Sequence, residues 1–291
     1  ELQTFSPPVG SIVGSEISDI LIGTSADDAI YGMGGNDKLN GADGIDTAHF
    51  RTANSALQVS EVGGITSVRG GYAAGDHAYS TSRLWNIEYL QTTDATLALT
   101  APSVTPILGT LNRELLKGTS GDDLLDGLGG ADIINGGQGN DSLVVFGTKS
   151  QFDLISLEGI TLLSGREGSA EYAGFDSRII NTESIIFSNA APISLTTTSD
   201  GIVLGTTASD RLIGTAAAET FDGLGGNDTV DGGAGFDSLV FFAASQDFTL
   251  TPSDSSNSIT IKGNAGSRYA NQTTVASNIE RIAFSDRVID T

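Results

Sequence analysis

The chain has 291 residues and a formal net charge of −22, because 36 aspartates and glutamates outnumber 14 lysines and arginines. This acidic excess excludes nucleic-acid binding as a main activity and disfavours adsorption to anionic lipid, since both need a basic surface. Cysteine is absent and no apolar segment reaches the length of about 20 residues that spans a bilayer, so we expect no disulfides, no thiolate metal site and no membrane insertion.

Three similar units follow one another, and their glycine-rich parts start 95 and 96 residues apart. This internal period predicts three modules rather than one large domain. We expect an N-terminal arm at residues 1–13 and modules at residues 14–100, 107–195 and 203–291. In each module a glycine-rich roll precedes a flank of short strands, with the rolls at 14–49, 109–144 and 205–240 and the flanks at 50–100, 145–195 and 241–291.

Each roll contains four nonapeptides that start with glycine and carry an acid at the sixth position and an apolar residue at the eighth. Glycine permits a tight turn over the first six residues, and the last three residues extend as a short strand. The eighth position points inward from that strand, so an apolar column should form the core. The twelve sixth-position acids are Asp19, Asp28, Asp37, Asp46, Glu114, Asp123, Asp132, Asp141, Asp210, Glu219, Asp228 and Asp237.

The spacing of these acids suits a bound cation. Two nonapeptides complete one coil, so turns 18 residues apart lie side by side and can surround one ion with oxygen atoms. Calcium fits better than magnesium because it accepts about six to eight oxygens in a flexible geometry, and we expect about six ions, two per roll. The expected pairs are Asp19 with Asp37, Asp28 with Asp46, Glu114 with Asp132, Asp123 with Asp141, Asp210 with Asp228, and Glu219 with Asp237. Supplementary oxygens are expected from the fifth-position residues Asp27, Asn36, Asp122, Asn140 and Asn227.

The stretches "GLGGADIINGGQGND" and "GLGGNDTVDGGAGFD" resemble the nonapeptide of the RTX (repeats-in-toxin) family, also named hemolysin-type calcium-binding repeats. The resemblance covers all three rolls and their flanks, and "NIERIAFSD" resembles the segment that commonly follows such repeats in secreted RTX proteins. It implies a parallel β-roll that binds calcium. We therefore predict an all-β fold of three tandem parallel β-roll blocks, each capped by a β-strand flank.

Two of the expected pairs depart from the family pattern. Glutamate replaces aspartate at Glu114 and Glu219, Arg113 lies beside Glu114, and "GTAAAET" lacks the inner glycine. We expect the sites that contain Glu114 and Glu219 to be the weakest.

Each flank ends with an Asn-x-Glu-x-apolar step, for which we expect an Asn turn and a strand with an exposed Glu rather than a metal ligand. The flank arginines are expected to be solvated, and the aromatic residues to pack in the core rather than to form a carbohydrate-stacking patch. The arginines are Arg83, Arg178, Arg268, Arg281 and Arg287, and the aromatic residues are Trp85, Tyr72, Tyr79, Tyr89, Tyr172 and Tyr269.

The chain lacks the sequence signatures of metalloproteases, serine hydrolases, P-loop enzymes and dinucleotide-binding enzymes, so we predict no enzymatic activity. The preferred interpretation is a secreted calcium-binding structural or adhesive protein of a bacterial cell surface, which folds and assembles on calcium binding as a surface-layer, filament or matrix subunit. Its partners would be other copies of itself or surface polysaccharide. Two alternatives are open: the non-catalytic folding and secretion region of a larger exoenzyme, and a glycan-binding module.

Overall fold

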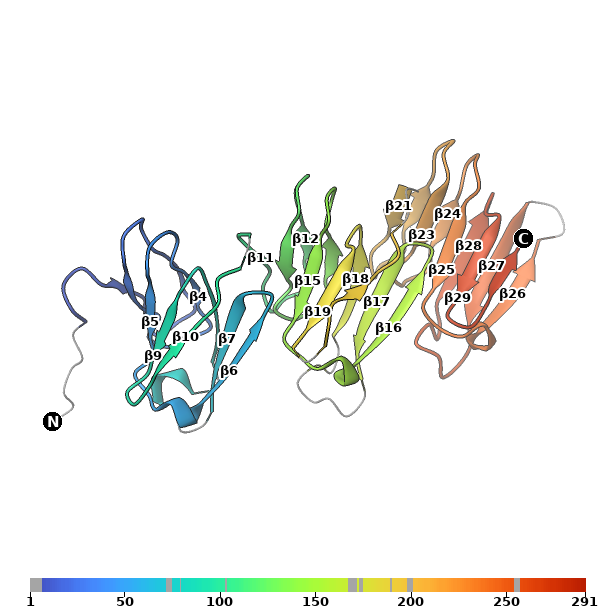
Figure 1. The fold of residues 1–291 in the computed structure, drawn as a ribbon. Helices are drawn as coiled ribbons and strands as arrows, with labels where there is room; N and C mark the ends of the chain where they lie inside the picture. Colours follow the sequence, from blue (N-terminus) through green and yellow to red (C-terminus); the bar gives the residue numbers. More distant parts are fainter. Residues whose placement is uncertain are drawn as a thin grey trace.

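The structure is a computed structural model that describes residues 7–71, 75–78, 80–102, 104–166, 172, 175–188, 190–197, 201–253 and 257–291. Tyr72, Tyr79 and the first six residues of the expected N-terminal arm lie outside these ranges. The described residues form three modules that follow one another along the molecule (Figure 1). They contain short strands and four 3-10 helices but no α-helix, and none of their helices is long and apolar enough to cross a membrane.

The first module comprises β1 (Ile12–Val13), β2 (Ile20–Ile22), β3 (Ala29–Tyr31), β4 (Lys38–Asn40), β5 (Thr47–His49), η1 (Asn54–Ala56), β6 (Leu57–Val62), β7 (Ile65–Gly70), η2 (Gly75–His77), β8 (Thr81–Trp85), β9 (Tyr89–Gln91) and β10 (Thr96–Ala98). The second comprises β11 (Ile107–Leu108), β12 (Leu115–Lys117), β13 (Leu124–Asp126), β14 (Ile133–Asn135), β15 (Ser142–Val145), η3 (Lys149–Gln151), β16 (Phe152–Leu157), β17 (Ile160–Gly165), β18 (Asp176–Ile180), β19 (Ser184–Phe187) and β20 (Ile193–Ser194). The third comprises β21 (Gly201–Leu204), β22 (Arg211–Ile213), β23 (Glu219–Asp222), β24 (Thr229–Asp231), β25 (Ser238–Phe241), η4 (Ser245–Asp247), β26 (Phe248–Pro252), β27 (Ser258–Gly263), β28 (Thr273–Ser277), β29 (Arg281–Phe284) and β30 (Val288–Asp290).

Each module contains two five-stranded sheets in its described part, and the strand order is the same in all three modules. In the first module these orders are β1-β3-β5-β9-β10 and β2-β4-β8-β7-β6. Successive roll strands alternate between the two sheets. Within a sheet they are parallel and 18 residues apart, as in the pairing of Leu21 with Leu39 and of Ile30 with Ala48. The predicted all-β fold of parallel β-rolls is therefore confirmed.

The eighth-position side chains form the predicted apolar column between the two sheets of each module. Eleven of these twelve described residues are buried, and the other, Leu21, is partly buried and packs against the same core. Ile30 and Leu39 are fully buried at neighbouring levels of the first core. Because each fully buried side chain of this size contributes about 1.5–3 kcal/mol, the column is a main source of stability.

The flank does more than cover the end of the roll, because it continues the coil. β8 lies parallel to β4 and β9 lies parallel to β5, so the flank adds a third coil in the same register. β7 and β6 then extend one sheet with antiparallel pairing, and β10 extends the other. The rolls also start earlier than the sequence predicted: β1 belongs to the first sheet rather than to the arm, and β21 starts before residue 203.

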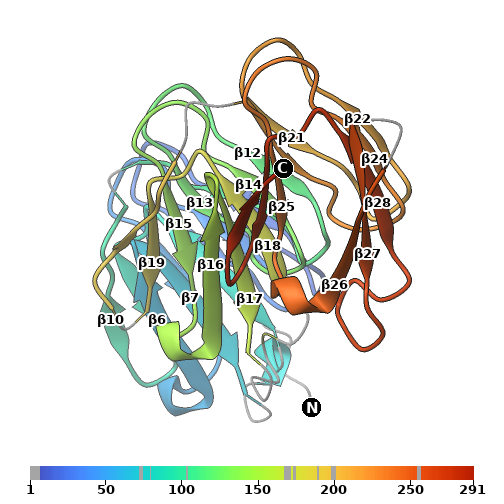
Figure 2. The same ribbon diagram turned by 90° about the vertical axis from the view of Figure 1, so that its right-hand side faces the viewer.

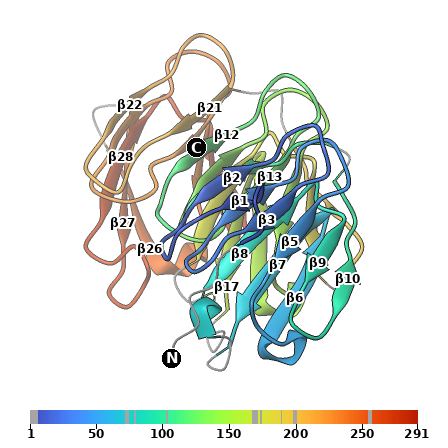
Figure 3. The ribbon, with the colours of Figure 1, turned by 90° about the vertical axis from the view of Figure 1, so that its left-hand side faces the viewer.

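Consecutive modules pack through the outer faces of neighbouring sheets. The views along the row of modules show them one behind another, with the third module displaced to one side (Figure 2 and Figure 3). Hydrophobic side chains fill part of each junction. The clusters include Val62, Ile65, Leu124 and Val144 at the first junction, and Ile160, Leu162, Val240 and Phe242 at the second.

A buried arginine crosses the first junction. The Arg83 guanidinium lies 2.7 Å from the Asp126 carboxylate of the next module, and 8% and 5% of these side chains are exposed. The same guanidinium lies over the Phe146 ring, 4.1 Å from its centre. The expectation that the flank arginines are solvated is wrong for Arg83, because the next module supplies both an acid and an aromatic face.

The second junction repeats this contact. Arg178 lies 2.6 Å from Asp222 and 4.6 Å from the centre of the Phe242 ring, so it is a second buried flank arginine. The outer faces of the row differ. The strand register places Val275 of the third module at the position of Arg178, and Tyr31 of the first module at the position of Asp222.

Candidate calcium-binding sites

The six predicted acid pairs are all brought together by one recurring hydrogen bond. In each pair the main-chain N–H of the first acid donates to a carboxylate oxygen of the acid 18 residues later. The N to Oδ1 distances are 3.0 Å for Asp19 to Asp37, 2.8 Å for Asp28 to Asp46, 3.0 Å for Glu114 to Asp132, 2.8 Å for Asp123 to Asp141, 3.0 Å for Asp210 to Asp228, and 2.9 Å for Glu219 to Asp237. The predicted pairing geometry follows directly from the register of the coil.

The first member of each pair has donors within its own turn. We call these residues the first-turn acids: Asp19, Asp28, Glu114, Asp123, Asp210 and Glu219. The Asp28 carboxylate, for example, accepts hydrogen bonds from the Thr24 main-chain N–H at 2.6 Å and the Thr24 hydroxyl at 2.9 Å. A serine or threonine occupies the second position of all six turns, and it donates to the acid each time. The sequence has Ser or Thr at this position in all six turns, but the residue type alone does not specify that the hydroxyl donates to the acid.

The second members of the pairs are buried and incompletely hydrogen-bonded. We call Asp37, Asp46, Asp132, Asp141, Asp228 and Asp237 the second-turn acids. Each is at most 4% exposed. Within the described part of the chain, the Oδ2 atoms of five of them have no hydrogen-bond partner: those of Asp37, Asp46, Asp132, Asp141 and Asp237. A buried carboxylate oxygen without a donor is costly, so these five atoms are the strongest local sign of a cation position.

Burial also shifts the protonation of these acids. It raises the pKa of all six second-turn acids above the ordinary value, because water no longer solvates the charged carboxylate. The pKa is raised to about 7 for Asp37 and Asp132, and to about 6 for Asp228 and Asp237. A bound divalent cation would favour the ionised form and oppose these shifts.

The donor atoms around these acids fit calcium. Among the described residues, no three His, Cys, Asp or Glu side chains gather into one metal site, so main-chain carbonyl oxygens must complete each ligand set. Glycine at the first position leaves room for them. A Cβ atom at Gly14 would lie 2.8 Å from both the Asp19 carboxylate and the Gly32 carbonyl oxygen. A cradle made of carboxylate and carbonyl oxygens alone matches the preference of calcium for hard oxygen ligands.

The fifth-position residues make hydrogen bonds between neighbouring turns. The side-chain Oδ1 of Asp27 accepts a hydrogen bond from the Ile45 main-chain N–H at 2.9 Å, one coil further along. Asn36, Asp122 and Asn227 accept equivalent main-chain hydrogen bonds, and the Asn140 main-chain N–H is the donor to Asp122. The side chains of four of these residues therefore connect neighbouring turns: Asp27, Asn36, Asp122 and Asn227. Calcium ligation by Asp27, Asn36, Asp122, Asn140 and Asn227 stays a prediction.

The two pairs that contain glutamate have distinct surroundings. Lys38 of the first module reaches across the junction and donates to the Gly109 carbonyl oxygen at 2.5 Å, in the turn of Glu114. Burial lowers the pKa of Lys38, and the nearby charge of Glu114 opposes that shift. In the third module, hydrogen bonds from Thr215 lower the pKa of Glu219. An ammonium group in this position would compete with a bound cation, and a weak site at Glu114 stays a prediction.

The Asn-x-Glu step of each flank forms a further turn in the same stack. Asn86 has a φ of 51°, as predicted for an Asn turn, and Asn181 and Asn278 have φ values of 46° and 51°. The Glu88 carboxylate accepts a hydrogen bond from the Asp46 main-chain N–H at 2.7 Å, and Glu183 and Glu280 make the same contact. The prediction that this glutamate is exposed is wrong, because its side chain is half-buried against the second-turn acid.

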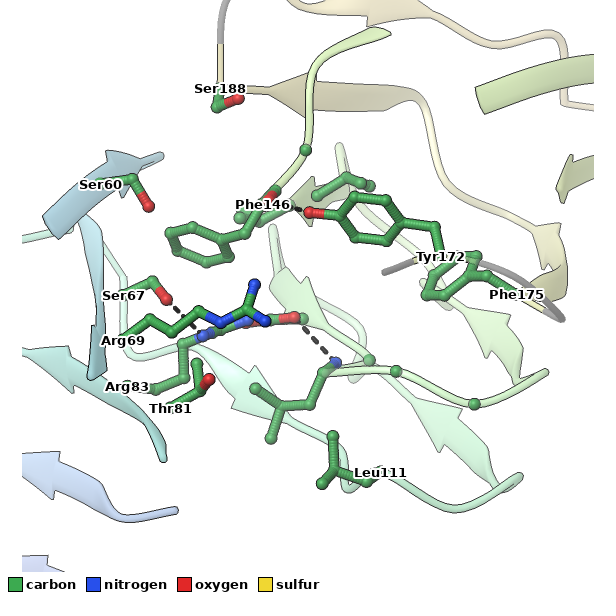
Figure 4. A pocket seen from close by; sticks show the side chains of 18 of the residues that line it. Ser60, Ser67, Arg69, Thr81, Arg83, Leu111, Phe146, Tyr172, Phe175 and Ser188 are labelled. Atoms are coloured by element: carbon green, nitrogen blue, oxygen red, sulfur yellow. Dashed lines mark hydrogen bonds and ion pairs between the residues drawn. The ribbon is translucent and has the colours of Figure 1, made fainter. Parts of the chain in front are cut away.

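A cleft of about 610 Å³ lies at the first junction, beside the Arg83 contact. Figure 4 shows Ser60 and Ser67 of the first module facing Phe146 and Tyr172 of the second. The Tyr172 hydroxyl donates to the Phe146 carbonyl oxygen, which fixes its ring at the wall. Tyr172 is therefore partly available to the cleft, whereas Trp85 and Tyr269 are buried as predicted for core aromatic residues.

Two small side chains account for this cleft. Ser60 pairs with Ser67 across β6 and β7, and the same register in the second module pairs Ile155 with Leu162. Ile155 and Leu162 pack into the apolar cluster of the second junction. The serines are smaller, so the equivalent space at the first junction is not filled by side chains.

Comparisons with known proteins place the rolls in a family. A sequence model of the RTX calcium-binding nonapeptide repeat (four copies) matches residues 13–48, 108–143 and 204–239. No curated protein matches the chain. Among solved structures, the crystal structure of extracellular lipase LipA from Serratia marcescens matches over 94% of this chain, with 12% sequence identity and a TM-score of 0.19. The chain spans 38% of that lipase chain, and so low a TM-score carries no argument about fold or activity. On the repeat match and the observed coil, the three rolls are RTX calcium-binding nonapeptide repeats.

Proposed function

We propose that the protein is a secreted structural or adhesive component of a bacterial cell surface, and that its three rolls fold when calcium binds. The buried second-turn acids are the observation that carries this proposal. Each lies beside a first-turn acid, and five of them have an unpartnered oxygen in the described structure. Buried like charges disfavour folding unless a cation neutralises them, so calcium binding and folding should be one coupled process.

The six acid pairs would hold the ions. Calcium, when bound, would neutralise the paired carboxylates and draw main-chain carbonyl oxygens of neighbouring turns toward one point. The protein contributes the coil register that places each second-turn acid below a first-turn acid, and the glycine at each turn that leaves the cradle open. Extracellular calcium modules have dissociation constants of about 10⁻⁴ to 10⁻³ M, so the rolls should stay unfolded in calcium-poor cytosol and fold after export.

A scaffold role is supported by the junctions. Buried ion pairs and apolar clusters connect the modules, so the described residues form one elongated body rather than three domains joined only by linkers (Figure 1). A net charge of −22 would keep such a body soluble until calcium reduces its self-repulsion. Both features suit a subunit that is exported unfolded and then assembles with other copies or binds surface polysaccharide.

Calcium titration of the whole chain tests the proposal. Circular dichroism should show little strand signal in chelator and a cooperative gain of strand in millimolar calcium, with a matched magnesium titration giving a weaker response. Light scattering and electron microscopy on the same samples report assembly. Equal strand content in chelator and calcium would refute calcium-linked folding. A folded protein that stays monomeric and does not bind cells would reject the surface role but keep the folding mechanism.

Glycan binding is a second candidate function, favoured by the cleft at the first junction. Its hydroxyl groups and aromatic rings are groups that contact sugars in other binding sites. Replacing Ser60 with Ile and Ser67 with Leu copies the second junction and should fill the cleft. Glycan-array binding in calcium should then disappear while calcium-dependent folding is kept. The matched control is T251I with T260L, the same register pair in the third module, which should leave binding unchanged. A wild-type protein that binds no glycan in calcium eliminates this candidate.

A further inference from the structure

The further turn formed by the Asn-x-Glu step continues the hydrogen-bond ladder of the acids. The Asp28 N–H donates to Asp46 at 2.8 Å, and the Asp46 N–H donates to Glu88 at 2.7 Å. Strand pairing continues in the same way, since β9 follows β5 as β5 follows β3. Glu88 therefore stands to Asp46 as Asp46 stands to Asp28, although it lies 42 residues further along the chain rather than 18.

The space next to this ladder is the same at both levels. A Cβ atom at Gly23 would collide with the Gly41 carbonyl oxygen and lie 3.0 Å from the Asp28 carboxylate. A Cβ atom at Gly41 would collide in the same way with the Asn86 carbonyl oxygen and would also meet the Asp46 carboxylate. The Asn86 carbonyl thus takes the place of a turn carbonyl of the roll.

An unpartnered oxygen lies at this level in all three modules. Asp46 is 0% exposed, and its Oδ2 has no hydrogen-bond partner. Asp141 and Asp237 are each 1% exposed and also carry an unpartnered Oδ2. At the equivalent glycines, Gly136 and Gly232, an added Cβ atom would collide with these carboxylates and with the carbonyl oxygens of Asn181 and Asn278. The flank glutamate accepts a hydrogen bond from the main-chain N–H of the aspartate. This contact leaves the buried Oδ2 of the same aspartate without a partner.

We propose that each module holds a further calcium ion between its last sixth-position aspartate and the flank glutamate, in addition to the two ions expected in each roll. The ligands would be the carboxylates of the Asp46 and Glu88 pair, the Asp141 and Glu183 pair, and the Asp237 and Glu280 pair, with the carbonyl oxygens of Asn86, Asn181 and Asn278. The whole chain then binds about nine ions rather than about six. This inference rests on the proposed calcium-linked folding of the rolls, and it makes the flank a part of the metal-binding unit.

The test is a count of bound calcium on the full chain by equilibrium dialysis. The triple variant E88Q, E183Q and E280Q keeps an amide oxygen to accept the main-chain N–H but removes the charge, so it should lose about three ions. The control is E61Q, D153N and D290N, which neutralises one acid per flank outside the turns and should lose none. Circular dichroism in saturating calcium checks that both proteins are folded.

The outcomes separate this inference from the proposed function. A triple variant that binds as many ions as the wild type, with the wild type binding calcium, overturns the inference and leaves the proposed function intact. A wild type that binds no calcium refutes both. If the triple variant fails to fold in calcium, each single glutamine variant serves instead, because two modules remain unchanged, and the loss of one ion per variant is expected. A crystal structure in calcium should show Asp46 and Glu88 on one ion, and a Glu88 carboxylate bonded only to the Asp46 N–H would contradict the assignment.

Discussion

Arg178 and Asp222 lie 2.6 Å apart across the second junction, with 5% and 2% of their side chains exposed. The pair belongs to two modules, so it can form only when both are folded and docked. A buried charge that loses its partner is strongly destabilising, whereas an exposed pair contributes little. The junction therefore links the stability of one module to that of the next.

Replacing Arg178 with Met should lower the free energy of unfolding in saturating calcium by about 3–5 kcal/mol, because the buried Asp222 carboxylate loses its cationic partner and, among the described residues, keeps only the hydrogen bond from the Leu224 main-chain N–H. The double variant R178M with D222L should recover part of this loss. Urea unfolding followed by circular dichroism measures the change. The control is R166M, which removes an ion pair with Asp153 whose side chains are 51% and 55% exposed. The R166M variant should lower the free energy of unfolding by less than about 1 kcal/mol. Equal losses in R178M and R166M would contradict a stabilising role for the buried ion pair at the junction.

Replacing Asp46 with Asn should weaken calcium binding and lower the calcium-dependent melting temperature of the first module. The reason is that Asp46 is fully buried and its Oδ2 has no protein donor. The matched control is D43N in the same turn, where the side chain is exposed. We expect at least a tenfold rise, about 1.4 kcal/mol, in the apparent dissociation constant for D46N only. Isothermal titration calorimetry on the full chain would show whether the two variants differ.

The pair that contains Glu114 should bind calcium more weakly than its neighbour in the same roll. Lys38 donates to the Gly109 carbonyl oxygen beside Glu114, and this ammonium competes with a cation. We expect E114Q to change total calcium binding less than D123N does. Dialysis of both variants against limiting calcium distinguishes them. A larger loss for E114Q would show that the glutamate turn is a strong site.

Calcium binding should weaken as the pH falls from about 8 to about 5, because protons compete for the second-turn acids. Burial raises the pKa of Asp37 to about 7 from an ordinary value of 3.8. A carboxyl group with a raised folded-state pKa stabilises the fold below its ordinary pKa and loses that contribution as the pH rises through its folded-state pKa. In chelator, residual structure should therefore be greatest near about pH 4 and disappear by about pH 7. Circular dichroism across this pH range measures both trends: calcium-dependent folding in the presence of calcium, and residual structure in chelator. Residual structure in chelator that increases with pH would contradict the raised pKa values.

The sequence predicts the roll well because one short pattern specifies several levels of structure. Glycine at the first position sets the turn, the acid at the sixth sets the pairing 18 residues apart, and the apolar residue at the eighth sets the core. These relations are local and repeated, so the coil register follows from counting. The six acid pairs and the buried apolar column could therefore be predicted from the sequence.

The flank turn does not follow from counting nonapeptides, because a long hairpin separates it from the roll. Glu88 is followed two residues later by Leu90, as Asp46 is followed by Ala48, so an acid and an apolar residue at the same spacing marked the next turn. The buried arginines were missed for a different reason. Arg83 meets an acid 43 residues away in another module, and no local pattern reports such a contact. The only signal was comparative: Arg83 and Arg178 share a position that Val275 holds in the third module.

The absence of this matched pair from the two outer faces gives the row a polarity. Tyr31 replaces the acid on the first module's outward face, and Val275 replaces the arginine on the third module's outward face. Tyr31 is only 7% exposed and stacks on His49 of its own module, whereas Val275 is 39% exposed. Two copies placed end to end would therefore lack the ion pair that joins opposite charges at each inner boundary. Any lattice of this protein must then grow by different chemistry, and sideways growth from the long edges of the row would leave the terminal faces out of the contact altogether.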